Sequence, residues 1–307
     1  MIEVVGLTKR YPERLAVNEL SFKVVPGEVV GFLGPNGAGK STTMKMLTGF
    51  LTPSAGSIQV CGFDVVREPI KAQKMVGYLP EGAPCYGEMS VLDFLLFVGR
   101  VRGYNGKELT ERVKRVIGLL ELEPVMGQNI DTLSKGFNRR VGLAQAVMHE
   151  PKVLILDEPT DGLDPNQKHQ VRKLIRSLAQ DRIVIVSTHI LEEVSALCTR
   201  VMLIARGELI VDETPHQLLQ RSRYHQAVTL YAEHALDKEA LRALPGVLAL
   251  EENELEGSVT LIPEAGHVLF DAVNGLIRER GWKVKEIEVE AGRLDEVFRR
   301  LTRGEHQ

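Results

Sequence analysis

A short glycine-rich segment constrains the fold of this 307-residue chain more than any other part of its sequence. Gly34-Pro35-Asn36-Gly37-Ala38-Gly39-Lys40-Ser41 matches the pattern G-x-x-x-x-G-K-[ST] and lies between an apolar run, Val29–Leu33, and a helical run, Thr42–Thr48. Glycines let successive backbone N–H groups turn inward around phosphate oxygens. We therefore expect a phosphate-binding loop, with Lys40 facing the β- and γ-phosphates and the Ser41 hydroxyl facing Mg²⁺. A glycine-rich turn without a ligand is the alternative.

Acidic residues follow a second apolar run. Val153–Asp157 leads directly into Glu158, and a carboxylate that ends a buried strand beside a phosphate-binding loop is suited to hold Mg²⁺ through water. We expect Asp157 to have that role and Glu158 to take the proton from the attacking water. Considered alone, an acidic pair in this position is equally typical of a helix cap or a turn.

A histidine follows a third apolar run. His189 comes two residues after Ile183–Ser187. If this strand neighbours the strand at 153–157, His189 lies at the carboxyl edge of the sheet, where ligands of open α/β sheets bind. A neutral imidazole can hydrogen-bond the γ-phosphate from there. An isolated histidine more often has a purely structural role.

Two helix starts carry residues that fit both a structural and a chemical role. Asp164 precedes Pro165, a pattern that predicts a capped helix, and its carboxylate is also available for a contact across a subunit interface. Ser134, within Leu133–Phe137, is a good N-cap for an amphipathic helix that we expect at Asn138–Met148. The same cap geometry offers a hydroxyl and backbone N–H groups to an anion.

The hydrophobic pattern predicts two domains. Residues 1–220 alternate β-rich runs with helical patterns, which is typical of α/β proteins, and residues 86–150 form a helical subdomain without strands. Residues 221–307 follow the order β-α-β-β-α-β with a final helix, which resembles a ferredoxin-like module. The expected fold is therefore an α/β domain followed by a small α+β domain.

Composition excludes several classes of protein. With 38 Lys and Arg against 41 Asp and Glu, the chain has no basic footprint for nucleic acid. Its apolar runs are far shorter than the ~20 residues of a membrane span, and the start Met1–Val4 lacks the pattern of a signal peptide, so we expect a cytoplasmic protein. The three cysteines, Cys61, Cys85 and Cys198, are too far apart to indicate a disulfide framework or a zinc site.

The motifs over about residues 1–220, in their order and spacing, resemble the nucleotide-binding subunit of ATP-binding cassette (ABC) transporters. The resemblance implies a P-loop cassette with a mixed sheet core and a helical subdomain, which hydrolyses ATP with Mg²⁺. Lys40, Glu158 and His189 would act in hydrolysis, with Glu158 as the base and His189 as the switch histidine. Tyr11 would stack on the adenine, and Gly34–Ser41 with Thr42 would cradle the triphosphate. The remaining matches are the Mg²⁺ ligands Ser41 and Asp157, the signature residues Ser134 and Gly136, and Asp164 of the D-loop.

The resemblance also implies partners. Two cassettes of this family close head to tail, and the signature of one completes the ATP site of the other, so one cassette per chain implies a homodimer. The expected lack of a span implies a separate integral-membrane permease and a peripheral place on the cytoplasmic face of the inner membrane. The loop near Glu81–Glu88 and the helical subdomain would form the docking groove for that permease.

The sequence departs from the family pattern at two places. Glu81 stands where a Mg²⁺-contacting glutamine is usual, and we expect it to contact the nucleotide site and ligate Mg²⁺ while adding negative charge beside the phosphates. In the signature, Lys135 and Phe137 replace the usual glycine and glutamine, whereas Ser134 and Gly136 are retained. We expect the signature to function.

These departures and the C-terminal module resemble a branch of bacterial exporters that includes multidrug and gliding-associated types. The cargo of such a system is chosen by the permease, which this chain does not contain. A soluble ABC ATPase acting on ribosomes or nucleic acid is the alternative, although such proteins usually carry two cassettes, coiled-coil insertions or zinc modules. For the C-terminal module we expect a stabilising contact in the dimer, with regulation or simple stabilisation of the chain as alternatives.

Overall fold

The computed structural model describes residues 1–82, 85–232, 234, 236–253, 255 and 257–303. The chain divides into two compact units, Met1–Glu213 and Thr214–Gln307. The boundary expected at residue 220 falls at the end of helix α8 (Pro215–Gln220), which lies in the second unit because it packs against the last helix, α11 (Leu294–Arg303). No helix within the described ranges is long and apolar enough to cross a membrane.

The first unit is built on a six-stranded sheet with the order β10-β9-β3-β8-β7-β6. The inner strands are parallel, and β10 pairs antiparallel with β9 at one edge. The apolar runs that predicted β3, β7 and β8 are buried along their whole length, as expected for strands covered on both faces. The strands are β3 (Val29–Leu33), β6 (Val76–Leu79), β7 (Val153–Asp157), β8 (Ile183–Thr188), β9 (Arg200–Ala205) and β10 (Glu208–Glu213).

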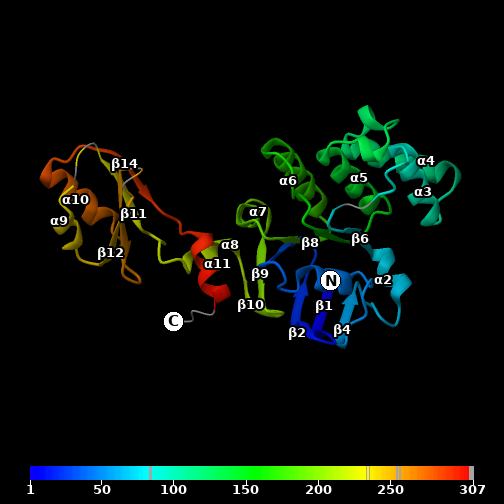
Figure 1. Ribbon diagram of the computed structural model, residues 1–307, viewed down its shortest axis with the longest axis horizontal. Coiled ribbons are helices and arrows are strands. Elements are labelled where there is room, and N and C mark those ends of the chain that lie inside the picture. The colour runs from blue at the N-terminus through cyan, green and yellow to red at the C-terminus, as the bar shows by residue number, and fades with distance from the viewer. Residues whose placement is uncertain (83–84, 233, 235, 254, 256, 304–307) are drawn as a thin grey trace. The chain divides into compact units, whose positions relative to one another are not determined.

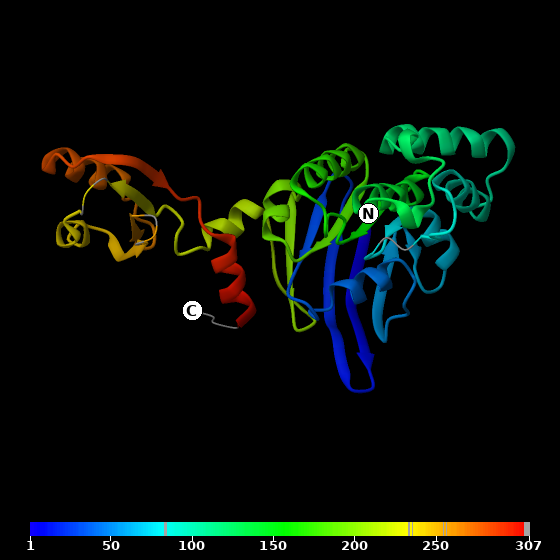
Figure 2. The same ribbon diagram turned by 45° about the horizontal axis from the view of Figure 1, so that its top comes forward.

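A second, antiparallel sheet with the order β2-β1-β4-β5 belongs to the same unit. Its strands were not predicted from the sequence, because they alternate buried and exposed residues and so lack continuous apolar runs. Its long β1–β2 hairpin is prominent in Figure 2. Buried side chains of β1, β2 and β4 share one core with α1 (Lys40–Leu47) and β3. The strands are β1 (Ile2–Tyr11), β2 (Arg14–Val24), β4 (Ala55–Val60) and β5 (Phe63–Asp64).

Helices occupy the segment between β6 and β7, where the helical subdomain was expected. Apart from one isolated bridge between Ser90 and Asn129, the described residues of this segment form no strand pairing. Figure 1 shows α3, α4 and α5 on the opposite side of the six-stranded sheet from β1, β2 and β4. The helices of the unit also include α2 (Pro69–Met75), α3 (Val91–Val101), α4 (Gly106–Leu120), the 3₁₀ turns η1 (Glu123–Val125) and η2 (Ile130–Thr132), α5 (Lys135–Val147), α6 (Pro165–Ala179) and α7 (Leu191–Leu197).

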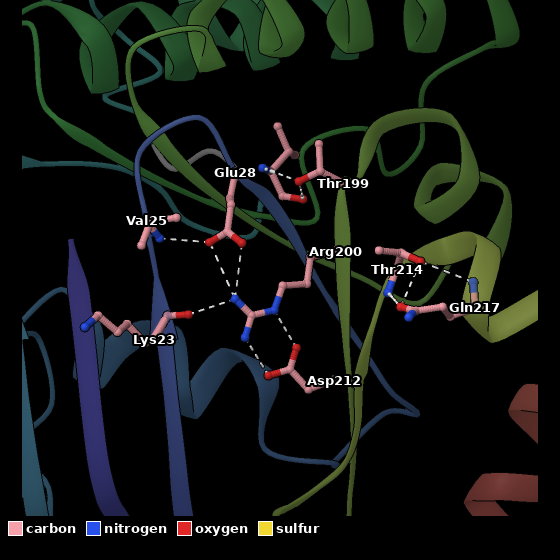
Figure 3. Close-up of polar contacts among 9 residues, drawn as sticks. Lys23, Val25, Glu28, Thr199, Arg200, Asp212, Thr214 and Gln217 are labelled. Atoms are coloured by element: carbon pink, nitrogen blue, oxygen red, sulfur yellow. Dashed lines mark hydrogen bonds and ion pairs between the residues drawn. The ribbon is translucent and has the colours of Figure 1, made fainter.

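Arg200 holds the start of the strand that leads into the phosphate-binding loop. Its guanidinium donates to Asp212 on β10 at 2.5 and 2.7 Å, to Glu28 at 3.2 Å and to the carbonyl of Lys23 at 2.9 Å (Figure 3). Glu28 directly precedes β3. A partly buried bidentate pair of this kind is geometrically specific, so it fixes β3 relative to β9 and β10.

The second unit has its own sheet and core. The sheet order β12-β13-β11-β14, with all neighbours antiparallel, is that of the β-α-β-β-α-β module expected from the sequence. Alternate residues of the strands pack with the two helices in a core that includes Trp282. The elements are β11 (Val228–Ala232), α9 (Lys238–Arg242), β12 (Val247–Asn253), β13 (Ser258–Pro263), α10 (Phe270–Arg280) and β14 (Val284–Val289).

Candidate functional site

The glycine-rich segment forms a tight loop between β3 and α1. Gly37 and Gly39 have φ angles of 80° and 106°, which residues with a side chain rarely adopt, and a Cβ at Gly39 would lie 2.5 Å from the carbonyl oxygen of Ala16. The Lys40 ammonium donates to the carbonyls of Gly34 and Pro35 at 2.7 and 3.2 Å, which places it inside the loop. Burial lowers the pKa of Lys40, while the carboxylates of Glu158, Asp157 and Glu81 oppose that shift. The loop therefore holds a cation amid three anionic groups.

The Mg²⁺ ligands expected from the sequence meet at the carboxyl ends of adjacent strands. The Asp157 side chain, at the end of β7, is almost fully buried and accepts hydrogen bonds from Ser41 at 3.4 Å and from Ser187 at the end of β8. A hydroxyl and a carboxylate this close fit Mg²⁺, which takes one or two protein oxygens and keeps its waters or phosphate oxygens. Ser41 and Asp157 could hold the ion together.

Glu158 and His189 are direct partners. Strands β7 and β8 are parallel neighbours in which Asp157 pairs with Ser187, so both residues lie at the same edge of the sheet. The Nδ1 atom of His189 lies 2.7 Å from the Glu158 carboxylate. Burial raises the pKa of Glu158, and the hydrogen bond from His189 opposes this shift. A carboxylate with a raised pKa beside a half-exposed histidine is suited to proton transfer.

A buried carboxylate on α7 fixes the two loops that carry this pair. The Glu193 side chain, 1% exposed, accepts hydrogen bonds from Thr160, two residues after Glu158, and from Thr188, directly before His189, the latter at 3.4 Å. Arg172 on α6 lies 3.7 Å from the same carboxylate. One buried carboxylate therefore connects the segment that carries Glu158 to the end of β8, directly before His189.

The hairpin β1–β2 brings Tyr11 to the rim of the loop. Tyr11 pairs with Arg14 across the hairpin, and the Arg14 guanidinium donates to the carbonyl of Gly37. The Tyr11 ring is 41% exposed, with the ammonium of Lys9 5.4 Å from its centre. An exposed aromatic ring tied to the phosphate-binding loop is available for stacking on a base.

Of the signature residues, Gly136 packs against α6 and Ser134 caps α5. Ser134 caps α5 with its hydroxyl 3.4 Å from the Phe137 amide, and the helix begins at Lys135, three residues before the predicted start. A Cβ at Gly136 would lie 2.8–3.0 Å from the side chain of Gln167. Asp164 accepts a hydrogen bond from the Gln167 amide at 2.9 Å, which confirms the predicted helix cap.

Glu81 lies beyond the end of β6, exposed and within electrostatic range of Lys40. Residues 83 and 84 of the predicted docking loop lie outside the described part of the chain. Nearby, the buried hydroxyl of Tyr78 has no hydrogen-bond partner among the described residues, and burial, with smaller contributions from Asp157 and Glu81, raises its pKa. Tyr78 lines a groove of about 550 Å³, together with Phe50, Val76, Phe94, Phe97 and Val101.

Sequence reasoning missed three residues of this site. Arg139 on α5 is 6% exposed, and its Nη1 atom has no hydrogen-bond partner within the described ranges. Its burial lowers its pKa, opposed by the carboxylates of Asp161 and Glu158. Ser187, which binds Asp157, and Arg14, which binds the loop, were also unremarked. The only signal for Arg139 was its place five residues after Ser134, because its burial depends on tertiary packing.

A phosphate-binding loop, two carboxylates at the end of β7 and a histidine directly after β8 are typical of a P-loop nucleoside triphosphatase. A family model described as "ABC transporter" matches residues 17–161. The Nod factor export ATP-binding protein I of Burkholderia lata is 38% identical over 231 residues, which are 75% of this chain and 76% of the relative. The chain belongs to the ATP-binding subunits of ABC transporters, as the sequence resemblance predicted.

Further comparisons agree with this assignment. The Nod factor export ATP-binding protein I of Paraburkholderia xenovorans is 34% identical over 309 residues, covering 100% of this chain and 98% of the relative. A solved ATP-binding subunit of an ABC transporter is 27% identical, with a TM-score of 0.65 over 72% of this chain and 92% of its own. The dimeric bacterial cassette MJ0796, also solved bound to ADP and Pi, shares the fold with a TM-score of 0.64 at 23% identity, over 70% of this chain and 99% of its own. The cassette fold is therefore confirmed, and the chain is an ATPase.

Proposed function

We propose that this ATPase powers the export of a substrate through a separate membrane permease. The observation that carries the catalytic part is the meeting of Lys40, Ser41, Asp157, Glu158 and His189 at one edge of the sheet. Export is supported by the names of the relatives, which are export ATP-binding proteins, and the Paraburkholderia relative matches both units of this chain. The Nod factor itself belongs to those relatives, and we propose no cargo here.

Each residue of the site has a distinct role in the proposed binding and hydrolysis of ATP. Tyr11 stacks on adenine, and the loop from Gly34 to Thr42 binds the phosphates. Lys40 neutralises the β- and γ-oxygens, while Ser41 and Asp157 hold Mg²⁺, which supplies charge neutralisation when it is bound. Glu158 accepts the proton of the attacking water, and His189 orients Glu158 and hydrogen-bonds the γ-phosphate.

The working unit is a head-to-tail homodimer. Ser134 is exposed at the start of α5, beside Gly136, so its hydroxyl and the first amides of this helix are available to a nucleotide held by a second copy. Asp164 caps α6 beside them and is placed to contact the same interface. In this arrangement each ATP lies between the loop of one copy and the signature of the other.

The groove lined by Tyr78 is the docking site for the permease. Two apolar residues that line the groove are largely exposed to solvent: Phe50 is 77% exposed and Val101 is 71% exposed. Exposed apolar surface around a groove marks an interaction site, and the helical subdomain forms one wall of it through α3. Docking there would place the chain at the cytoplasmic face of the inner membrane.

The decisive experiment on catalysis is the Glu158→Gln variant. It should bind MgATP, lose at least 99% of turnover and form a dimer on size-exclusion chromatography, because the site closes on ATP that it cannot hydrolyse. Glu192→Gln, on the exposed first turn of α7, is the matched control and should behave like the wild type. A Glu158→Gln variant with full turnover, or one that stays monomeric in saturating MgATP, would overturn the mechanism.

A separate experiment tests the partner. The tagged chain, purified from membranes in detergent, should co-purify with a protein that has several membrane-spanning segments. Substitution of Val101 with Asp should abolish this association without changing ATPase activity. Recovery with ribosomes alone would favour the soluble alternative.

A further inference from the structure

Lys135 is the one residue between Ser134 and Gly136 of the signature, and the proposed function gives it no role. It is the first residue of α5, between Ser134 and Gly136, at the position where the family pattern has a glycine. Its side chain lies across Gly162 in the loop that leads to α6. A Cβ at Gly162 would be 3.4 Å from Cδ of Lys135 and 3.3 Å from its Nζ. Gly162 has a φ of 69°, so a glycine there suits both the backbone and the lysine that covers it.

Lys135 is exposed, and its ammonium has no hydrogen-bond or ion-pair partner among the residues that the structure describes. Of the two acids beside Gly162, Asp164 accepts from the Gln167 amide, and Asp161 acts electrostatically on the buried Arg139. The aliphatic stem is thus held by packing, while the charge at its end remains available.

We propose that Lys135 binds the γ-phosphate of the ATP held by the second copy of the chain. This inference rests on the proposed head-to-tail dimer, in which Ser134 and Gly136, on either side of Lys135, face that phosphate. A lysine is a compact charge that binds phosphate without a strict orientation, so it suits a position where the stem sets the direction.

The charge of Lys135 also offsets the other departure from the family pattern. Glu81 adds a negative charge near Lys40, in the site that the signature of the second copy completes. Charges of opposite sign within a partly desolvated site attract strongly, so the lysine of one copy compensates the glutamate of the other. The two departures therefore act as a pair across the interface.

The test uses dimer formation by the Glu158→Gln protein as its readout, followed by sedimentation velocity during a MgATP titration. Lys135→Met keeps the stem over Gly162 and removes the charge, and it should raise the MgATP concentration for half-dimerisation at least tenfold. Lys135→Arg restores a charge and should stay within about threefold of the parent. Lys107→Met, on the outer face of α4 with 90% of its side chain exposed, is the control and should change nothing. Adding Glu81→Gln should reduce the penalty of Lys135→Met.

Three results would overturn the proposal. If Lys135→Met dimerises like the parent, the lysine acts only through its stem. If Met and Arg impair dimerisation equally, the shape of the side chain matters and not its charge. If the Glu158→Gln parent itself stays monomeric in MgATP, the proposed dimer is wrong and this inference fails with it.

Discussion

Glu158 has a backbone conformation that few residues with a side chain adopt, with φ at 51°. Its amide donates to the carbonyl of Ser187 at 3.1 Å, and its carboxylate meets His189. The strain of such a conformation, of order 1 kcal/mol, persists where the surrounding contacts over-determine it. Here those contacts come from β8 and from the buried Glu193, so the sheet and α7 fix the orientation of the proposed base.

The electrostatics of this pair predict the acid limb of the pH–rate profile. Glu158 must be ionised to accept a proton, and burial raises its pKa above the usual 4.5, so the rate should fall as pH decreases through that raised value. The hydrogen bond from His189 lowers the pKa of Glu158, hence His189→Ala should move the acid limb to higher pH and cut kcat roughly tenfold or more. Measurement of kcat/KM from pH 5 to 8 checks this, and a limb that stays in place or moves to lower pH would contradict it.

Glu81 predicts an altered dependence on metal. Its charge reaches Lys40 and Tyr78, so a cation beside it is stabilised relative to the usual neutral glutamine. We expect Glu81→Gln to raise the Mg²⁺ concentration for half-maximal ATPase activity about three- to tenfold, with a smaller effect on kcat at saturating metal. The measurement is a Mg²⁺ titration at fixed ATP. The idea is abandoned if Glu81→Gln and Glu81→Ala both leave the metal dependence and the turnover unchanged.

The strands and helices show which parts of the fold local sequence can predict. Strands β3, β7 and β8 were evident because both faces are buried, which makes the runs continuously apolar. The β1–β2 hairpin was not, because its one buried face leaves a weaker alternation. Most residues proposed for the site were identified from motifs at strand ends. Arg139 was not, because only packing of α5 against the sheet turns a helical arginine into a buried group beside carboxylates.

The contact between the end of α5 and β6 predicts a pH-dependent stability. His149 follows α5, its Nε2 lies 3.0 Å from the carbonyl of Val76 at the start of β6, and burial together with the charge of Arg102 lowers its pKa to about 4. The unfolded chain takes up this proton near pH 6.5 and the folded chain only near 4. The contribution is therefore present above pH 6.5 and lost as the pH falls towards 4.

His149→Gln isolates this contribution. The amide can still donate to the Val76 carbonyl but cannot be protonated. After discounting for partial exposure, we expect the wild type to lose about 1–2 kcal/mol more of its free energy of unfolding than the variant between pH 7 and 4.5. Urea unfolding followed by far-UV circular dichroism measures the difference. Parallel pH profiles for the two proteins would show that His149 is not the group involved.

Each of the two units has a hydrophobic core of its own, and one residue allows the core of the second unit to be followed alone. Trp282 is the sole tryptophan of the sequence, and it packs in the core formed by β11, β13 and α10. The residues proposed to bind nucleotide all lie within Met1–Glu213. Tryptophan fluorescence therefore reports on the second unit, whereas far-UV circular dichroism reports mostly on the larger first one.

Nucleotide should therefore stabilise the first unit more than the second, so the urea midpoints of the two signals should shift unequally. A ligand present at a hundredfold its Kd stabilises the state that binds it by about 2.7 kcal/mol. We expect MgADP at that level to shift the circular dichroism midpoint in urea to higher concentration and to leave the fluorescence midpoint of Trp282 within error. Lys40→Ala, which loses the ammonium inside the loop, should abolish the shift and serves as the control. If MgADP moved both midpoints together in the wild type, the two units would unfold as one cooperative body. Ligand binding to the first unit would then also stabilise the second.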